Sequence, residues 1–399
     1  MCHLPSLTGT AARALSSAAA LALASAAMQP ARAENPTLND FFDPKDGQLD
    51  LSEWLLDRKG LLPVPFVITE PAVGLGGGVM ALFFRESMRE AASRSGETGR
   101  LTPPDIYAIG GGATENGTKF GAAGGMVSFD EHRYRWRGGV MRTSVNLDFY
   151  GVGGQLAPLG YNLDGWTSVQ QGMKRLGDSD VWLVARWNYL DLKSRFDLED
   201  DAARFSELVR SNRSSGLGVS LEIDTRDSIF TPSSGWTGSL DLTWYDPDWG
   251  SDTRFQSHRA HAFAYWPITR EFVLAGRIDG RAADGKVPFY MLPSVELRGV
   301  PALRLQDRRT AVLETEARWN LTPRWALIGF IGTGRAWGSV SSDGTDTVAR
   351  GIGFRYLIAS RLGSTRASTR PEARKTVRST CRWVVRGADD VSPSSAPMG

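Results

Sequence analysis

The sequence predicts an all-β protein: a transmembrane antiparallel β-barrel of about 16 strands, preceded by a short N-terminal periplasmic helix. Three observations support this fold class. Apolar and polar residues alternate with period two over most of the chain, which is typical of strands with one apolar face. The alternating runs are about 10–14 residues long, whereas strands of globular proteins average about 5–6. Aromatic residues stand at the ends of the runs, where a membrane barrel places its interfacial girdles.

Residues 1–33 have the features of a secretory signal peptide. Arg13 supplies a positive charge, a small-residue apolar run covers 14–28, and Ala31-Arg32-Ala33 provides a cleavage pattern. The run is too short to span a bilayer. Cys381 is then the only cysteine that remains, so no intrachain disulfide is expected. The formal net charge of +2 gives no indication of a nucleic-acid partner. A secreted barrel belongs in the outer membrane of a Gram-negative bacterium.

Residues 34–61 form a short periplasmic leader in this interpretation. The capping box Asp50-Leu51-Ser52-Glu53 precedes Trp54, and Gly60 closes the segment, which predicts one short helix. The same stretch has some spacings of a calcium loop, but Phe42 and Pro44 occupy ligand positions, so calcium is not expected.

The barrel itself is predicted over residues 62–363. The expected strands cover 62–69, 74–84, 105–115, 118–128, 132–145, 161–173, 178–195, 213–225, 236–247, 252–267, 270–283, 310–321, 324–337 and 347–360. Asn116-Gly117 is a strong hairpin turn. The longer connections, 146–160, 196–212, 284–309 and 338–346, then lie on one side of the membrane, which we expect to be extracellular.

A soluble β-sandwich is the alternative to the barrel, with the apolar faces turned inward. The polar faces of the runs argue against it because they carry full charges: Glu222, Asp224, Arg226, Asp279 and Arg281. Trp236 and Trp244 bracket one predicted strand, as Trp325 and Trp337 bracket another. Charged faces suit a polar lumen, and bracketing tryptophans suit two membrane interfaces.

After Gly363 the alternation stops, and residues 364–399 are predicted to be an irregular tail. A membrane barrel should end on an alternating strand, because an unpaired edge in lipid is costly. Codon degeneracy allows a shifted reading frame from about Gly363 that encodes two further alternating strands. The tail is therefore interpreted either as a frameshifted version of the last two strands or as a genuine disordered segment. Sequencing the gene through this region separates the two interpretations.

The longest predicted loop contains Leu297-Arg298-Gly299-Val300, and the next strand contains Glu314 and Glu316. A lone arginine inside a barrel is costly unless it is paired, so we expect Arg298 to bind Glu316 and fix the loop. The alternative is a solvated arginine on the surface.

This motif resembles the tip of an inward-folded loop in the BamA/TamA-type superfamily of outer-membrane barrels, also called bacterial surface antigens. Other stretches resemble the same superfamily: Asp224-Thr225-Arg226-Asp227 with Pro232 and Gly235, and the leader motifs from Phe42 to Pro71, which resemble a subgroup lacking periplasmic repeats. The resemblance implies that Arg298 is held by acids on two strands. Glu316 matches the first position, but the second falls on Gly332, so the pairing is either weaker here or completed elsewhere.

The resemblance implies assembly or translocation of membrane proteins through a weak lateral seam. The periplasmic repeats of the superfamily need roughly 75 residues each, which the leader cannot hold. Two alternatives remain: a passive pore, and a structural surface antigen without insertase activity. Outer-membrane lipid and lipopolysaccharide are the expected surroundings, and client barrel proteins or a periplasmic partner are the candidate binding partners.

Neither an enzyme nor a cofactor site is expected. Gly74 and Gly76–Gly78 resemble a phosphate loop, but no helical period follows them. His258 and His261 fall on opposite faces of a strand and so cannot share a metal. We therefore predict no catalytic residues, no metal and no cofactor.

Overall fold

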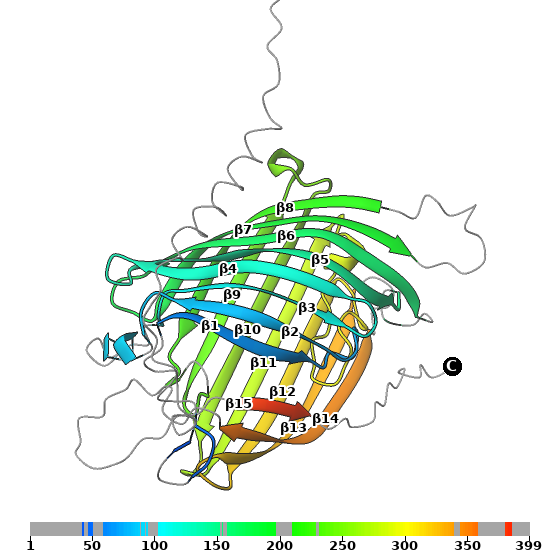
Figure 1. Ribbon diagram of the computed structural model, residues 1–399. Coiled ribbons are helices and arrows are strands. Elements are labelled where there is room, and N and C mark those ends of the chain that lie inside the picture. Colours follow the sequence, from blue (N-terminus) through cyan, green and yellow to red (C-terminus); the bar gives the residue numbers. More distant parts are fainter. Residues whose placement is uncertain are drawn as a thin grey trace, which may run out of the picture. The chain divides into compact units, whose positions relative to one another are not determined.

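A single antiparallel sheet makes up the protein in a computed structural model, in which the strands follow one another in sequence order (Figure 1). The structure describes residues 42–43, 47–50, 59–87, 89–91, 93–94, 103–151, 154, 158–196, 210–228, 231–338 and 344–357, and the backbone of 380–384. No helix in these described ranges is long and apolar enough to cross a membrane. The strands are β1 (Gly60–Ile68), β2 (Gly76–Phe84), β3 (Ile106–Thr114), β4 (Lys119–Phe129), β5 (Tyr134–Phe149), β6 (Leu159–Arg175), β7 (Val181–Phe196), β8 (Arg210–Asp224), β9 (Gly235–Tyr245), β10 (Phe255–Pro267), β11 (Phe272–Gly285), β12 (Arg309–Asn320), β13 (Trp325–Trp337), β14 (Thr345–Leu357) and β15 (Thr380–Val384).

Each of the strands β1–β14 coincides with a run predicted from the alternation. The largest difference in a boundary is four residues, at the end of β5, predicted at residue 145 and observed at Phe149. The all-β, antiparallel fold class is confirmed. The predicted helix falls on residues 51–58, which lie outside the described residues. A helical segment that the alternation did not predict, residues 89–91 and 93–94, lies between β2 and β3 instead.

The strand β15 lies within the tail that was predicted to be irregular. Thr380–Val384 pairs antiparallel with β14, from Leu357↔Thr380 to Gly353↔Val384. These five residues are therefore a strand in the sequence as given, although their alternation, from Thr380 to Trp383, is too short to have marked them as one. The other residues of the 364–399 segment lie outside the described part of the chain, and the frameshift interpretation stays a prediction.

The two faces of the sheet differ in the way the alternation predicted. On one face apolar side chains are exposed, such as Leu240 (60%), Ile278 (55%) and Leu313 (54%). The next residues along the same strands, Asp241 (6%), Asp279 (4%) and Glu314 (7%), are polar and buried. A soluble sandwich requires the opposite arrangement, because its apolar faces form the core. Exposed apolar and enclosed charged faces are typical of a membrane barrel.

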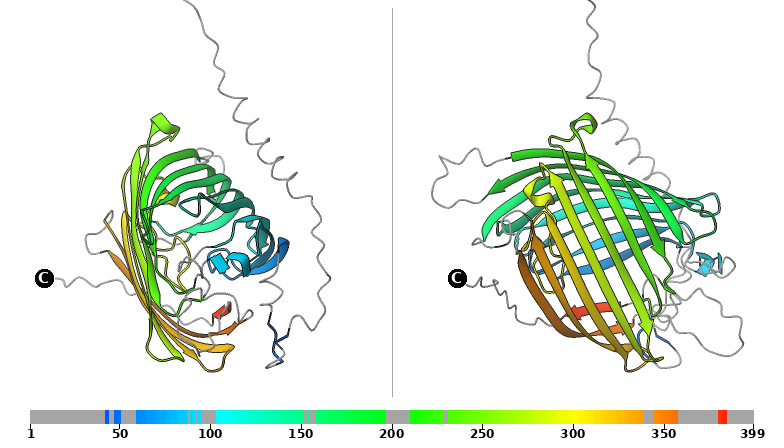
Figure 2. Two further views of the ribbon diagram at one scale, coloured as in Figure 1. Left: turned by 90° about the vertical axis from the view of Figure 1, so that its left-hand side faces the viewer. Right: turned by 180° about the vertical axis from the view of Figure 1, so that it is seen from behind.

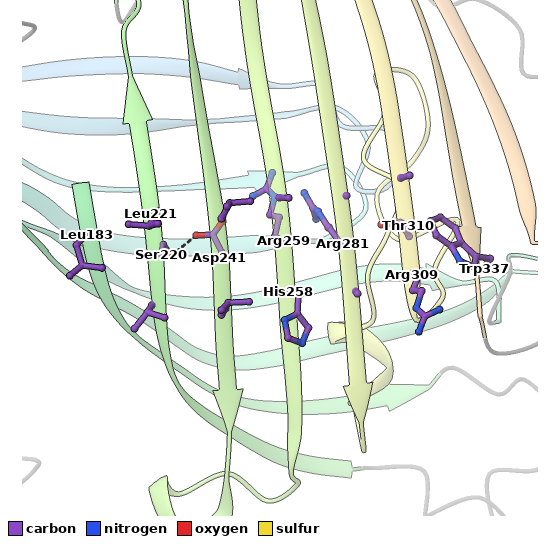
Figure 3. A pocket seen from close by; sticks show the side chains of 17 residues that line it. Leu183, Ser220, Leu221, Asp241, His258, Arg259, Arg281, Arg309, Thr310 and Trp337 are labelled. Carbon is purple, nitrogen blue, oxygen red and sulfur yellow. Dashed lines mark hydrogen bonds between the residues drawn. The ribbon is translucent and has the colours of Figure 1, made fainter. Parts of the chain in front are cut away.

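The apolar face carries a shallow groove across β7–β13, with a volume of about 760 Å³ (Figure 3). Leu183, Leu221 and Trp337 contribute apolar side chains to it, and His258 also lines it. Ser220 Oγ donates to Asp241 Oδ1 at 2.6 Å between two of these strands. His261, three residues after His258, has its Nδ1 3.1 Å from Ser239 Oγ and lines a different cavity.

Figure 2 shows that the sheet is strongly curved, with the β11–β12 loop on its concave side. The glycine-rich strands β2–β4 lie at the start of this curve. Gly78 lies under the ring of Phe66, where a Cβ atom would be 2.5 Å from Phe66 Cζ and 2.2 Å from Gly111 O. Phe66 in turn stacks on Phe120 of β4, with 6.3 Å between ring centroids. Gly76–Gly78 therefore belong to a strand covered by aromatic rings and not to a phosphate loop.

The described part of the leader contacts the turn between β12 and β13. Arg324 in that turn is 2% exposed, and its Nη2 lies 2.9 Å from Asp43 Oδ2 while its Nη1 lies 3.0 Å from Asp50 Oδ2. Leu49 O accepts a hydrogen bond of 3.0 Å from Tyr356 Oη on β14. We call these five residues the leader clamp. The described residues of the predicted leader are thus attached to the C-terminal part of the sheet.

Candidate functional site

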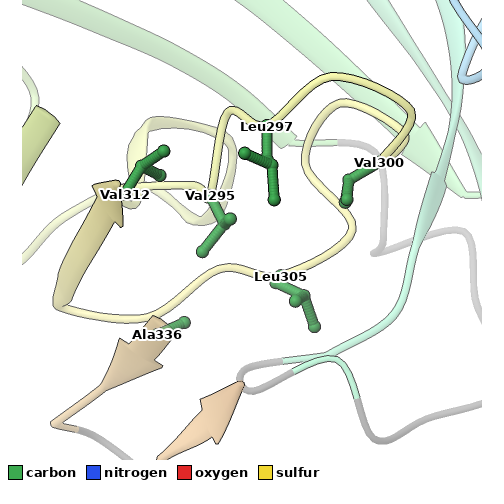
Figure 4. Packing of buried hydrophobic residues seen from close by; sticks show 6 residues of the cluster. All are labelled: Val295, Leu297, Val300, Leu305, Val312 and Ala336. Carbon is green, nitrogen blue, oxygen red and sulfur yellow. The ribbon is translucent and has the colours of Figure 1, made fainter. Parts of the chain in front are cut away.

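The loop 286–308, between β11 and β12, has a small apolar core of its own. Its residues Val295, Leu297, Val300 and Leu305 are 1–8% exposed and pack with Val312 of β12 and Ala336 of β13 (Figure 4). A β-bridge between Ser294 and Gln306 closes the loop. Burial of these side chains fixes the loop against the concave face of the sheet.

Arg298 lies at the tip of this loop and contacts two carboxylates of β12. Its Nη1 lies 2.5 Å from Glu316 Oε2 and its Nη2 2.6 Å from Glu314 Oε1. The guanidinium also covers the ring of Phe330 on β13, 4.0 Å from the centroid. The Arg298 side chain is 15% exposed, so the pairs form in a partly desolvated place, where charge-assisted bonds are strongest.

Glu314 supplies the second carboxylate, which the resemblance would have put at residue 332. Gly332 is the direct cross-strand neighbour of Glu314. A Cβ on Gly332 would lie 2.6 Å from Leu297 Cδ1 and 3.1 Å from Glu314 Cγ. The missing side chain at 332 therefore makes room for Leu297, and the acid comes from the neighbouring strand instead. Of the two alternatives left open by the sequence, completion by another residue is the one seen in the geometry.

Arg355 on β14 extends the ion network beyond the loop. Its Nη2 lies 2.9 Å from Glu316 Oε1, so Glu316 lies between two arginines. Another arginine, Arg281 on β11, pairs with Asp279 at 3.0 Å and with Glu296 of the loop. The ion pairs thus join the loop to β11, β12 and β14.

Gly299 follows Arg298 and adopts φ +85° with no heavy atom near a built Cβ. Glycine is favoured here because it adopts this left-handed backbone conformation without steric cost. A larger side chain would have room, so lack of space is not the reason. Of the other residues of the motif, Leu297 and Val300 are buried, 4% and 8% exposed. The four motif residues therefore have distinct tasks: two pack, one turns the chain, and one binds carboxylates.

Aromatic residues hold the first part of the loop. Phe289 contacts Phe149, Tyr161 and Phe196 at centroid distances of 5.2–5.3 Å. Tyr290 donates its hydroxyl to Asn212 Oδ1, 3.3 Å away, and burial raises the pKa of this hydroxyl above its ordinary value. At its far end the loop reaches the β1–β2 turn, where Ala302 N donates to Glu70 Oε1 at 3.0 Å.

The Asp224–Asp227 turn, singled out in the sequence, is also held by a residue of β12. Asp224 pairs with Arg226 at 2.7 Å. Arg318 Nη2 donates to Pro232 O and to Ser233 Oγ, both at 2.9 Å. Sequence reasoning missed Arg318, although it alternates with Glu314 and Glu316 on the same face of β12.

Substitution of Gly332 by alanine tests the close packing of the loop on β13. We expect Gly332→Ala to displace Leu297 and lower stability by about 1–3 kcal/mol, the usual cost of overpacking. The measurement is the temperature at which the folded band is lost in heat-modified electrophoresis. Gly329→Ala is the matched control, since a Cβ there meets nothing within 4 Å. Equal transitions for the two variants would contradict the packing described here.

The described residues hold no group of three or more metal-ligating side chains. The chemistry that the loop site offers is ion pairing and apolar packing between a loop and the strands around it. Such an arrangement positions a loop inside a curved sheet and fixes the relative positions of its strands.

Comparisons with known proteins agree with this architecture. Residues 133–294 match the family model described as the Omp85 superfamily domain. A solved structure of BamA from Haemophilus ducreyi lacking POTRA domains 1–3 is similar, with a TM-score of 0.54 and 12% identity, over 98% of this chain and 78% of that one. CdiB from Escherichia coli gives a TM-score of 0.50 and 10% identity, over 73% of this chain and 55% of that one. No curated protein matches significantly. At these identities the structural matches show the fold alone.

Proposed function

This chain carries a region that matches the Omp85 superfamily domain and resembles the BamA/TamA-type barrels, and from that premise we propose that it is an outer-membrane barrel with a weak lateral seam at β1. The seam separates β1 from the C-terminal strands and accepts a strand of a client membrane protein. The observation that carries the proposal is that, among the described strands, β1 pairs with β2 and lies at one end of the strand order.

Within the described strands, β1 pairs with β2 and has no pairing to β14 or β15. Two prolines, Pro63 and Pro65, lie inside β1. Proline has no N–H and is tolerated in a strand only where that position faces a free edge. The edge of β1 that would close a barrel therefore lacks two backbone donors, and each one removes a ladder hydrogen bond worth about 0.5–1.5 kcal/mol.

Both faces of β1 are apolar, which suits a strand that meets lipid. Leu61 and Val67 are 56% and 63% exposed on one face. Leu62, Val64 and Phe66 alternate with them on the other face. An unpaired apolar strand edge in a bilayer is a template for pairing with another strand. An incoming strand could bind the backbone N–H and C=O groups of this edge by β-augmentation, whereas Pro63 and Pro65 offer it only their carbonyl oxygens.

The β11–β12 loop supports the proposal through its position. It is attached to β12 by Arg298 and reaches the β1–β2 turn through Ala302 and Glu70. The loop thus connects the β1–β2 turn with β12, that is, the two groups of strands that the proposed seam separates. We propose that it folds into the lumen and keeps the barrel in shape while the seam is open.

Site-specific photo-crosslinking tests the seam. With a crosslinker at Val67 in β1, we expect adducts with a nascent barrel client in proteoliposomes, several times more abundant than with a crosslinker at Leu240. Leu240 is the matched control because it is equally exposed, at 60%, but lies mid-sheet in β9. Equal adduct yields at the two positions would count against the seam.

A double variant, Pro63→Ala with Pro65→Ala, tests the role of the missing donors. Two restored N–H groups should strengthen closure of the seam and reduce the client adduct at Val67. Unchanged or increased capture would show that the prolines do not weaken the seam.

A passive pore is the second candidate, favoured by the charged concave face of β5–β11. Conductance in planar bilayers, before and after deletion of residues 290–306, tests it. A barrel that stays sealed after the deletion would end the pore interpretation and leave the seam or a structural surface antigen. Lipid, lipopolysaccharide, client barrel proteins and a periplasmic partner remain the proposed binding partners.

A further inference from the structure

A cavity of about 490 Å³ on the concave face of β5–β10 has more positive than negative groups in its lining. Five arginines and three carboxylates line it: Arg135, Arg137, Arg186, Arg226 and Arg259, and Glu222, Asp224 and Asp241. The lining does not include the Leu297–Val300 motif or β1, and Arg259 links the cavity to the loop network through Asp279.

Four of these arginines have carboxylate partners. Arg137 pairs with Glu222 at 2.8 Å, Arg186 with Asp241 at 2.8 Å, and Arg226 with Asp224 at 2.7 Å. Arg259 pairs with Asp279, just outside the lining, at 2.7 Å. These pairs account for all three carboxylates of the lining.

Arg135 is the exception. Its guanidinium carbon lies 4.6 Å from the ring centroid of Trp182, and its Nε is buried with no acceptor among the residues that the structure describes. A second guanidinium, that of Arg175, lies 4.8 Å from the same ring. Trp182 is thus flanked by two positive charges, which raises the positive potential at Arg135.

A second buried donor without an acceptor lies beside Arg135. Ser128 is its direct cross-strand partner on β4, and opposite residues of an antiparallel pair have Cβ atoms about 4.5–5.5 Å apart. Ser128 Oγ is buried and has no partner within the described part of the chain. The neighbouring carboxylate, Asp105, accepts from Ser128 N at 2.8 Å and lies 3.5 Å from Arg85 Nη1. Asp105 accepts from neither Arg135 Nε nor Ser128 Oγ, both of which have no hydrogen-bond partner among the described residues.

We propose that Arg135, in the lining of the cavity, and Ser128, its cross-strand partner just outside that lining, bind a small oxyanion, a phosphate group. The Nε–H and one Nη–H of a guanidinium form a fork that matches two oxygens of a phosphate. The serine hydroxyl would donate to a third oxygen. Buried donors without acceptors are unfavourable, by about 1–3 kcal/mol for a neutral group and more for a charged one. An acceptor-rich anion removes that cost and balances the excess positive charge.

Calorimetry on the purified full chain in detergent tests the site, with inorganic phosphate as the probe and chloride at equal ionic strength as the reference. We expect saturable phosphate binding that Arg135→Gln weakens about ten-fold or more, since a charge-assisted hydrogen bond is lost. Ser128→Ala should weaken it several-fold. Arg142→Gln is the control: Arg142 lies on the other face of β5, 2.6 Å from Asp164, and its loss should leave binding unchanged.

Two further measurements keep the test decisive. Arg135→Lys retains the positive charge but not the planar fork, so it should bind phosphate with intermediate affinity. This variant keeps the site testable if Arg135→Gln fails to fold. Phosphate should change the tryptophan emission of the wild type, and Trp182→Phe should abolish the change. Titration with a short-chain phosphatidic acid identifies where the bound phosphate group comes from. Phosphatidic acid that binds more tightly than inorganic phosphate indicates a lipid headgroup, and phosphatidic acid that binds more weakly indicates a free solute. The proposal would be overturned if the heat of binding were the same for phosphate as for chloride, or if Arg135→Gln bound phosphate with the affinity of the wild type. Arg135 and Ser128 would then be two hydrated donors without a bound anion.

Discussion

Replacement of Arg324 by alanine is expected to cause the largest loss of stability of any single substitution in the described part of the chain. The side chain is 2% exposed and binds Asp43 and Asp50, and the Asp50 side chain is itself 5% exposed. Removal of one partner leaves buried charge uncompensated, which costs about 3–5 kcal/mol. We expect a marked fall in the temperature at which the folded band is lost on heating, together with faster proteolysis of the leader.

Arg270→Ala is the matched control for this variant. Arg270 is an exposed arginine in the turn between β10 and β11, at the same end of the sheet, and surface substitutions usually change stability by less than about 0.5 kcal/mol. Adding Asp50→Asn to Arg324→Ala should recover part of the loss, because the unpaired charge is then gone. If Arg324→Ala lowered the unfolding temperature no more than Arg270→Ala does, the leader clamp would not form in the membrane-inserted protein.

The second large effect is expected from Arg298→Ala. Glu316 keeps Arg355 as a partner, but Glu314 loses its contact with Arg298, and its Oε2 already has no hydrogen-bond partner in the described residues. We expect a loss of about 2–5 kcal/mol, close to the cost of breaking a buried ion pair. The loop should also become accessible to protease from the outside of the membrane.

A double-mutant cycle separates the two carboxylates of β12. Arg298 should couple to both Glu314→Gln and Glu316→Gln, by about 0.5–3 kcal/mol each, as expected for residues in one network. Arg298→Lys should recover only part of the wild-type stability because lysine cannot bridge two carboxylates with a planar fork. An unfolding temperature unchanged by Arg298→Ala would refute the pairing with both acids.

The sequence predicted the strands well because their physical cause is local. A strand between lipid and a polar interior must alternate, so each of β1–β14 carries its own signature. In β15 the alternation covers only Thr380 to Trp383, which is too short to mark a strand, and its pairing with β14 cannot be derived from period two. The helical residues 89–91 and 93–94 after β2 were likewise missed, because period two indicates strands and carries no signal for a helix.

The site was predicted only in part, for a geometric reason. Glu314 and Glu316 are two residues apart on one strand face, so periodicity cannot decide which of them meets Arg298; the structure places both within 2.6 Å. Arg355 and Arg324 were not identified at all because their partners are distant in sequence. Contacts of this kind depend on the curvature of the whole sheet, which no local pattern contains.

The leader clamp has a consequence for the order in which the molecule is completed. Asp43 and Arg324 are separated by 281 positions in sequence, so this contact must wait until β12 and the turn after it have been formed. Long-range contacts of this kind form late, because the entropy of closing a large loop must first be overcome. A chain that ends before residue 324 lacks the arginine that binds Asp43 and Asp50, and its amino-terminal segment stays accessible to proteases. The leader clamp therefore forms only in chains that contain β12 and the turn after it. Proteolytic quality control could recognise incomplete chains by their accessible amino-terminal segment.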